Sequence, residues 1–465
     1  MKTKTLPYFI ICPILYALIT ATGCNKQNEF LNAKPNQSLV VPESLSDYQA
    51  LLDNTNIFNL GIDPALGELS SDDFYVLPSI LNVRTDIERN TYLWAPTVYD
   101  AGQTPSDWSG PYQQVYYANT VLDGLSNIKI PPDQQKTCNQ IEGSALFFRS
   151  YAFYNLVQTF ALPFDPSTAN TDLGIPLRLT ADVTIKSVRA TEQACYNQVI
   201  NDLKKALPLL PAKSLYPTAP SQPAANALLA RIYLAIGDYA DALKYSNSCL
   251  AEYQTLVDYN TLTSPTTTAI NSTIIAEDIY HASMVNYSMI AVRRNSVVDS
   301  VLYASYADND LRKTKFFTIL DNLPQYPRFV GSYDFEGNKY DGLATDEIFL
   351  IRAECYAREG NAEAAMKDLN TLLLTRWKTG TFIPYTASSA TDALNQILIE
   401  RRKELVYRGL RWTDLRRLNK DNQFKITLVR NVNGTIYTLA PNDPKYALPI
   451  PDAEISISGL IQNPR

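Results

Sequence analysis

The chain has 465 residues, 46% of them hydrophobic, so it can bury a sizeable core as one large helical array or as two fused lobes. Its formal net charge of −6 at pH 7 and its lack of a basic run argue against a nucleic-acid partner. The 30 tyrosines are unusually many, and we expect them largely at surfaces and in pockets, because a buried hydroxyl needs a partner.

The first 23 residues are predicted to be a targeting segment. Lys2 and Lys4 supply a positive start, and the apolar stretch 8–20 is too short to span a bilayer comfortably. The small residues Thr20-Ala-Thr-Gly then lead into Cys24, a pattern that resembles the bacterial lipoprotein box. We expect cleavage before Cys24 and lipidation of that residue, with the lipid as the only membrane anchor. An ordinary secretory peptide with an incidental cysteine is the alternative.

Residues 24–41 are polar and are predicted to form a tether, followed by a single domain at 42–465. A first helix is expected to open at Ser44, where Asp47 completes a capping box. Longer helical patterns fall in three blocks, at about 108–160, 191–250 and 345–418. The remaining stretches are predicted to be loop-rich insertions, at about 62–107, 162–190, 255–343 and 420–465.

Two helical segments share a pattern when Gly237 is aligned with Gly360. Small residues then coincide where two helices would cross, as Ala230 does with Ala353, and a glycine stands at each turn. This is the helix–turn–helix spacing of a tetratricopeptide repeat. Because the units are far apart in the chain, a plain solenoid is not expected. The predicted fold class is therefore mainly α: interrupted tetratricopeptide-like helical repeats beside a loop-rich, irregular half.

The run 396–418 is predicted to form two charged helices separated at Gly409. Glu404 and Arg408 stand four apart, and Asp414 and Arg417 stand three apart, so both pairs are expected to bond. The many arginines beside apolar residues should tie neighbouring elements together, which is a structural role. A hairpin is predicted at 424–439, with its turn at Asn433-Gly434.

The stretch ERRKELVYRGLRWTDLRRLN at 400–419 resembles the signature of the SusD/RagB family of outer-membrane nutrient-binding lipoproteins. Other stretches similar to that family occur in its order along nearly the whole chain: DWSGPYQQVYYANTVLDGL, GSALFFRSYAFYNLVQTF, ANALLARIYLAIGDYADAL, DEIFLIRAECYAREGN and YALPIPDAEISISGLIQNP. The resemblance implies a protein that is lipid-anchored to the outer membrane, faces the cell exterior and binds ligand with its irregular half. It also implies that oligosaccharides are captured and handed to a SusC-like TonB-dependent β-barrel transporter. A peptide ligand, as in some members, is the alternative.

Aromatic and polar residues that could hold a sugar gather in two insertions. A pyranose offers a C–H face to an aromatic ring and hydroxyls to polar side chains, and loops on a rigid scaffold suit such contacts. Trp94, outside any helical pattern, is the first candidate platform, although a loop tryptophan is more often a packing anchor. The other candidates are Asp72, Asp73, Tyr75, Arg84, Tyr92 and Tyr99, with Asn286, Tyr287 and Tyr303 as an opposite wall.

No catalytic site, metal site or cofactor is predicted. His281 is the single histidine, so a catalytic triad or a His-rich metal site would depend on it alone. The cysteines are widely spaced and suggest no disulfide framework, and no EF-hand spacing makes Asp72-Asp73 a calcium pair. A glycoside hydrolase with paired carboxylates and a repeat-based adaptor without a small ligand are the alternatives from other classes.

Overall fold

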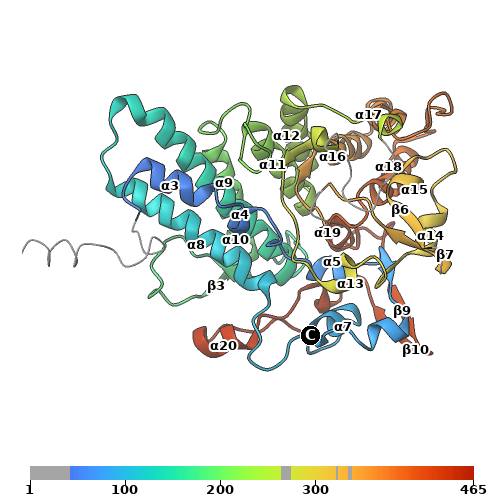
Figure 1. Cartoon of the computed structure of the whole chain (residues 1–465), viewed down its shortest axis with the longest axis horizontal. Helices are drawn as coiled ribbons and strands as arrows, with labels where there is room; N and C mark the ends of the chain where they lie inside the picture. Colours follow the sequence, from blue (N-terminus) through green and yellow to red (C-terminus); the bar gives the residue numbers. More distant parts are fainter. Residues whose placement is uncertain (1–41, 263–273, 321–322, 334–337) are drawn as a thin grey trace, which may run out of the picture.

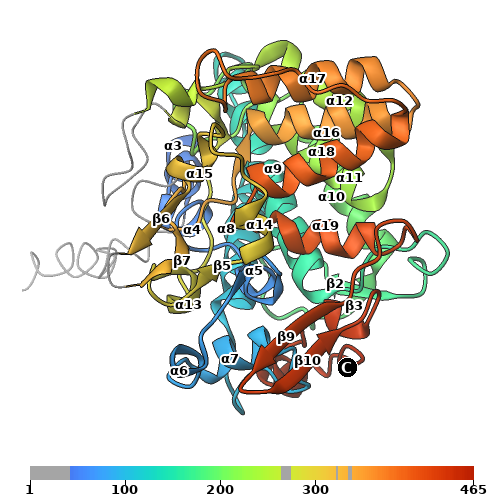
Figure 2. The same ribbon diagram turned by 90° about the vertical axis from the view of Figure 1, so that its right-hand side faces the viewer.

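The computed structural model describes residues 42–262, 274–320, 323–333 and 338–465. Within these ranges the chain is mainly helical, and its short strands pair two at a time. Most long helices lie together in one half, and most of the strands, short helices and loops form the other (Figures 1 and 2). No helix in the described ranges is both long and apolar enough to cross a membrane. The predicted leader, Cys24 and the tether lie outside the described residues.

Nine longer helices build the helical half of the described chain: α8 (Ser106–Asn127), α9 (Gln135–Phe160), α10 (Glu192–Ala206), α11 (Gln222–Ile236), α12 (Tyr239–Glu252), α16 (Thr345–Arg358), α17 (Ala362–Leu374), α18 (Ala390–Glu404) and α19 (Leu410–Leu418). Consecutive helices pack in pairs: α8 on α9, α9 on α10, α11 on α12 and α16 on α17. Gly237 and Gly360 make the turns within two of these pairs, with φ of 79° and 87°, values that favour glycine. The mainly helical class is confirmed, and the tetratricopeptide character of the pairs stays a prediction.

The loop-rich half contains short helices, namely α4 (Thr55–Phe58), α5 (Leu66–Ser70), α6 (Pro78–Leu81), α7 (Asp86–Tyr92), α13 (Ser288–Ala291), α14 (Ser300–Ala304), α15 (Arg312–Lys315) and α20 (Asp452–Ser458). The strands of the described chain form antiparallel pairs: β1 (Phe74–Tyr75) with β5 (Val297–Val298), β2 (Leu173–Pro176) with β3 (Arg189–Thr191), β4 (Asp278–Tyr280) with β8 (Leu343–Ala344), β6 (Phe317–Leu320) with β7 (Leu323–Phe329), and β9 (Leu428–Val432) with β10 (Thr435–Leu439). The β2–β3 pair lies against the long helices α9 and α10. The predicted hairpin is confirmed over 428–439, with positive φ at Asn433 and Gly434. The first helix, α3 (Leu45–Leu52), has the predicted capping box at Ser44.

The charged helices α18 and α19 are separated at Gly409, as predicted. The expected bond between Glu404 and Arg408 is wrong, because α18 ends at Glu404 and Arg408 lies beyond the helix. Glu404 instead accepts from Arg312 Nη1 at 2.9 Å and from Arg376 Nε at 2.6 Å. The second expected pair is confirmed, since Arg417 donates to Asp414 at 2.8 Å.

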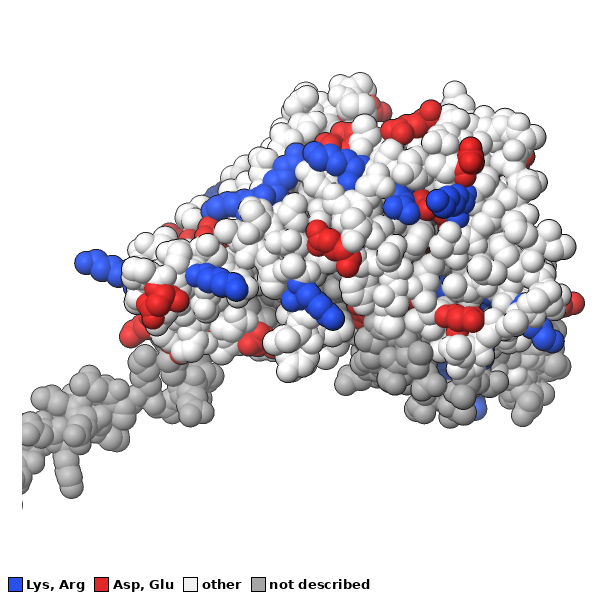
Figure 3. All heavy atoms as spheres, turned by 90° about the horizontal axis from the view of Figure 1, so that it is seen from above, with Lys and Arg blue, Asp and Glu red and all other residues white. Residues whose placement is uncertain are grey.

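Buried arginines join elements that are distant in the sequence, which confirms their predicted structural role. Arg376 is fully buried and binds both carboxylate oxygens of Glu277 at 2.9 Å. Arg231 of α11 binds Glu347 of α16 at 2.6 Å. At the surface shown in Figure 3, acidic and basic side chains are interspersed among uncharged residues. The ion pairs of Arg376 and Arg231 thus lie inside, where loss of one partner is costly.

Candidate functional site

The two insertions predicted to hold the ligand meet in the loop-rich half. Strand β1 of the first pairs with β5 of the second. The backbone amides of Ile62 and Asp63 donate to the carbonyl oxygen of Ser283 at 3.1 and 3.3 Å. This contact between residues 62–107 and 278–303 is termed the junction. The structure therefore brings together the two walls that the sequence suggested.

Glu88 of α7 is the buried polar centre of the junction. One of its carboxylate oxygens accepts from the Met289 amide at 2.7 Å and from Ser288 Oγ at 3.0 Å. The other accepts from Thr85 Oγ1 at 2.8 Å, in the capping box of α7. Arg84 donates from Nη1 to Ser288 Oγ at 2.6 Å. The half-buried Arg84 is thus held against the second insertion.

Tyr287 and Asn286 stand side by side in the second insertion. The Tyr287 hydroxyl donates to Asp107 Oδ2 at 2.6 Å, while two backbone amides of α5 and its cap donate to the other carboxylate oxygen at 2.6 and 2.9 Å. Burial raises the pKa of Asp107; burial and the neighbouring Asp107 carboxylate raise the pKa of Tyr287. Tyr287 therefore keeps its proton and is fixed as a donor, while Asn286 is exposed.

The expectation that Trp94, Tyr92 and Tyr99 offer ring faces to a ligand is corrected by their burial. Their exposed fractions are 5%, 2% and 6%. The indole Nε1 of Trp94 donates to the Ser70 carbonyl at 3.0 Å. The Arg430 guanidinium lies 4.4 Å from the Trp94 ring centre and 3.5 Å from that of Tyr92. Rings covered in this way cannot stack on a sugar, so these residues anchor packing.

Asp72 and Asp73 tie the first insertion to α18, to α19 and to the turn between these two helices. Asp72 accepts from Arg411 at 2.6 and 2.9 Å, and Arg402 lies 3.2 Å away. Burial acts to raise the pKa of Asp72, but the two guanidinium groups together hold that pKa well below its usual range. Burial raises the pKa of Asp73 to about 6, although Arg402 lies 3.7 Å away, and Asp73 accepts from the Tyr407 amide at 3.3 Å. Asp73 is buried and is corrected from a ligand contact to a structural one. Within the described ranges, no group of three or more His, Cys, Asp or Glu side chains could hold a metal ion.

Six candidates at the junction keep accessible surface: Asp72, Tyr75, Arg84, Asn286, Tyr287 and Tyr303. Burial raises the pKa of Tyr75, and the nearby Tyr326 hydroxyl raises it further. Tyr326 of β7 is half-buried and belongs to the same surface, but sequence reasoning missed it. Tyr326 lies in a weakly periodic insertion, where the sequence shows no regular pattern that would separate exposed positions from buried ones. Tyr303 of α14 is also half-buried, with its ring edge-on to a phenylalanine of β6 at 5.5 Å.

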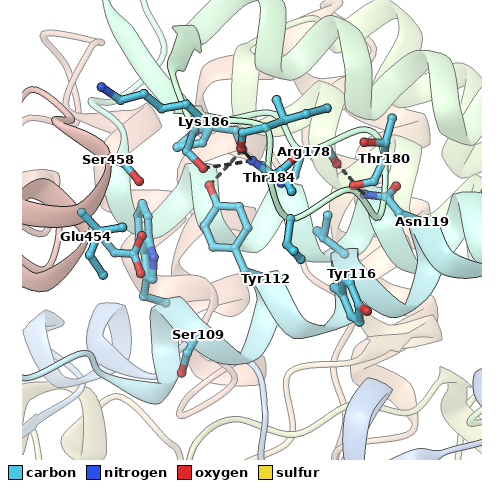
Figure 4. A pocket seen from close by; sticks show the side chains of 17 residues that line it. Ser109, Tyr112, Tyr116, Asn119, Arg178, Thr180, Thr184, Lys186, Glu454 and Ser458 are labelled. Atoms are coloured by element: carbon cyan, nitrogen blue, oxygen red, sulfur yellow. Dashed lines mark hydrogen bonds between the residues drawn. The ribbon is translucent and has the colours of Figure 1, made fainter. Parts of the chain in front are cut away.

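A cleft of about 610 Å³ lies between α8, the loop 176–187 and α20 (Figure 4). Tyr112 and Tyr116, one turn apart on α8, lie side by side in it. Tyr112 donates to the Pro176 carbonyl at 2.9 Å, and Tyr116 is 46% exposed. No residue predicted to bind ligand lines this cleft. The signal that could have found it is the pair of tyrosines four apart on one helical face.

Comparison with known proteins places the chain among relatives of similar length. Residues 29–234 match a family described as starch-binding and associating with the outer membrane, and residues 345–465 match the SusD family. The chain belongs to the SusD/RagB family. This family consists of carbohydrate-binding proteins associated with the outer membrane. Because its glycan-binding members are non-catalytic, the chain is not an enzyme.

Individual relatives agree with this SusD-family membership. The chain is 26% identical to SusD-like protein P2 of Formosa agariphila, over 77% of this chain and 79% of that protein. A SusD superfamily protein of Bacteroides thetaiotaomicron has the same fold, with a TM-score of 0.74, 21% identity, and 91% of this chain and 100% of that chain covered. A putative sugar-binding protein of Bacteroides vulgatus has a TM-score of 0.70 at 20% identity, covering 91% and 99%.

Proposed function

We propose that this SusD-family chain is a cell-surface lipoprotein that captures oligosaccharides at the junction and hands them to a SusC-like TonB-dependent transporter. The observation that carries the ligand part is the junction itself, where two segments distant in the sequence are fixed to each other. Tyr75 and Arg84 remain accessible on one segment, and Asn286 and Tyr287 on the other. A surface already held in place loses little entropy when it binds.

The accessible side chains match the two kinds of group that a sugar presents. The Tyr75 ring can pack against a C–H face. The Asn286 amide can donate to one hydroxyl and accept from another, and the Arg84 guanidinium adds further donors. Each hydrogen bond contributes a net of about 0.5–1.5 kcal/mol, so several contacts must act together.

The ligand proposal is tested with the full acylated chain in detergent, titrated with a panel of starch-derived and other oligosaccharides and with peptides. Asn286→Ala and Tyr75→Leu are each expected to weaken glycan affinity about fivefold, a loss of about 1 kcal/mol, without moving the denaturation midpoint. Asn422→Ala, another exposed asparagine on a different loop, is the matched control. Wild-type affinity in both junction variants would place the ligand elsewhere, and binding of peptides alone would replace the glycan as ligand.

The anchor proposal is supported by the sequence around Cys24 and by the outer-membrane association of the family. Cys24→Ala should abolish incorporation of labelled palmitate and release the chain from the membrane fraction. Cys12→Ala, which changes a cysteine inside the predicted leader, should leave labelling intact. Lipid incorporation into Cys24→Ala would contradict the anchor.

A further inference from the structure

Arg328 of β7 is a buried cation with unused hydrogen-bond donors. The residue is 1% exposed, and its Nη1 donates to the Ser296 carbonyl at 2.5 Å. Its Nε and Nη2 atoms are also buried, and the described part of the chain gives neither of them an acceptor. A buried charge without a partner is strongly destabilising, so its presence indicates a role beyond holding the fold together.

The unused edge of Arg328 is the edge that binds carboxylates elsewhere in this molecule. Three arginines each bind the two oxygens of one aspartate through Nε and Nη2, at 2.6–2.9 Å: Arg149 with Asp202, Arg352 with Asp368, and Arg411 with Asp72. Two parallel hydrogen bonds of this kind recognise a carboxylate by its shape as well as by its charge. Arg328 presents the same two donors without an aspartate, so it offers half of such a pair.

Strand β7 places Arg328 beside the junction. Strand β1 pairs with β5, and β5 contacts β7, which lies next to it in Figure 2. Tyr326 and Arg328 are two residues apart on β7 and share a face of that strand, with the guanidinium carbon 5.8 Å from the ring centre. Burial raises the pKa of Tyr75, and the charge of Arg328 acts against this rise. The guanidinium therefore lies close to both tyrosines of the junction surface.

The two tyrosine rings leave a way in from solvent. Tyr75 and Tyr326 are both half-buried, and among the described residues neither hydroxyl has a hydrogen-bond partner. Side chains at a surface change rotamer within nanoseconds, so a ring that no hydrogen bond holds can turn aside. The guanidinium of Arg328 is thus covered by movable groups, and it stays protonated at neutral pH.

The charges around the junction favour an anionic ligand. Asp299, the acid near Tyr75, accepts from the Leu302 amide at 2.8 Å and lies 3.7 Å from Arg402, so its charge is already engaged. Arg84 donates to the uncharged Ser288 hydroxyl, and its Nε has no acceptor in the described chain. Neither Arg84 nor Arg328 is therefore neutralised by an ion pair within that part of the chain, and uncancelled positive charge attracts anions.

We propose that the oligosaccharide captured at the junction is acidic, and that its carboxylate or sulfate group binds Nε and Nη2 of Arg328 between the rings of Tyr75 and Tyr326. Either group can present two oxygens to the two donors. The sugar ring that carries the group packs its C–H face against a tyrosine, a contact that favours a glycan over an acidic peptide. This inference rests on the proposed function, because it takes the junction from it, and it adds the chemical class of the sugar.

The test compares charged and neutral forms of the same sugars by calorimetric titration of the full acylated chain in detergent. The probes are tetragalacturonate with its methyl ester, and a sulfated galactan tetrasaccharide with its desulfated form. The wild type is expected to prefer at least one charged form over its neutral partner by about tenfold or more, and the pair that shows the preference identifies the group. Arg328→Met should bring that ratio to about one. Arg328→Lys keeps the charge without the paired donors and should keep only part of it.

Arg352→Met is the matched control, because it removes a guanidinium that binds an aspartate of α17 and should keep the wild-type ratio. A folding defect weakens both forms of a sugar alike, so the ratio reports on Arg328 even in a less stable variant. A wild-type ratio that persists in Arg328→Met would overturn the inference. Binding confined to neutral oligosaccharides would overturn it too, while leaving capture at the junction intact. Binding of acidic peptides alone, or of no glycan of either charge, would refute ligand capture in the proposed function and this inference with it.

Discussion

Trp94→Ala distinguishes a packing role from a ligand-stacking role. The ring is 5% exposed, donates to the Ser70 carbonyl at 3.0 Å and lies under Arg430. Removal of a buried tryptophan costs about 3–5 kcal/mol of unfolding free energy, and here it also leaves the Ser70 carbonyl without its donor. The φ of Trp94 is 52°, in the left-handed region that favours glycine. We therefore expect Trp94→Gly to be more stable than Trp94→Ala by up to about 1 kcal/mol, although both lose the ring.

The assay is urea denaturation followed by far-ultraviolet circular dichroism, with glycan titration of the same samples. Tyr116→Ala is the control, because that ring is 46% exposed and its loss should change the unfolding free energy by no more than about 0.5 kcal/mol. Unchanged stability in Trp94→Ala together with reduced glycan affinity would refute the assignment of this ring to the core.

Three other substitutions test the buried framework. Arg376→Ala leaves the buried Glu277 carboxylate without its cationic partner and Glu404 with Arg312 alone, and it should lower the unfolding free energy by about 3–5 kcal/mol in urea denaturation. Lys205→Ala, which removes an exposed ion pair, should cost under about 1 kcal/mol. Burial raises the pKa of Glu192 to about 7; the native state therefore holds this proton more tightly than the unfolded chain, and stability is lost as pH rises from about 4 through 7. Glu192→Gln should reduce that fall by about 1–3 kcal/mol in denaturation between pH 4 and 8, and an unchanged pH profile would contradict the shift. Gly342→Ala pushes a methyl group against the Tyr280 carbonyl and should cost about 1–3 kcal/mol in thermal unfolding, so a stable variant would contradict that close approach.

The long helices follow from the sequence because their signals act within a few residues. Ser44 with Asp47 starts α3, and Gly237 ends α11. The same local logic fails at Glu404, which stands four residues from Arg408 but binds Arg312 and Arg376 instead. Spacing along a helix indicates which pairs can meet, whereas tertiary packing decides which pairs do.

The candidate site is harder to predict because exposure is decided by distant segments. Trp94 and Tyr92 carry the rings a sugar needs, but Arg430 of the C-terminal hairpin covers both. Tyr75 and Asn286 stay accessible, yet nothing in their local sequence distinguishes them from the covered residues. Residue type and loop position therefore placed the candidates on two insertions that do meet, but they did not indicate which of those side chains are covered.

The buried candidates suggest how the loops can bind ligand without weakening the fold. Asp72 and Asp73 hold the first insertion to arginines of α18 and α19, so these carboxylates belong to the framework rather than to recognition. Under the proposed function, recognition falls to outer side chains such as the exposed Asn286, whose amide donates to Asn338 Oδ1 at 3.1 Å. Substitution in the inner layer should therefore lower stability and affinity together, because the junction itself is lost. Substitution in the outer layer should change ligand preference alone, since the backbone beneath it is fixed by other residues.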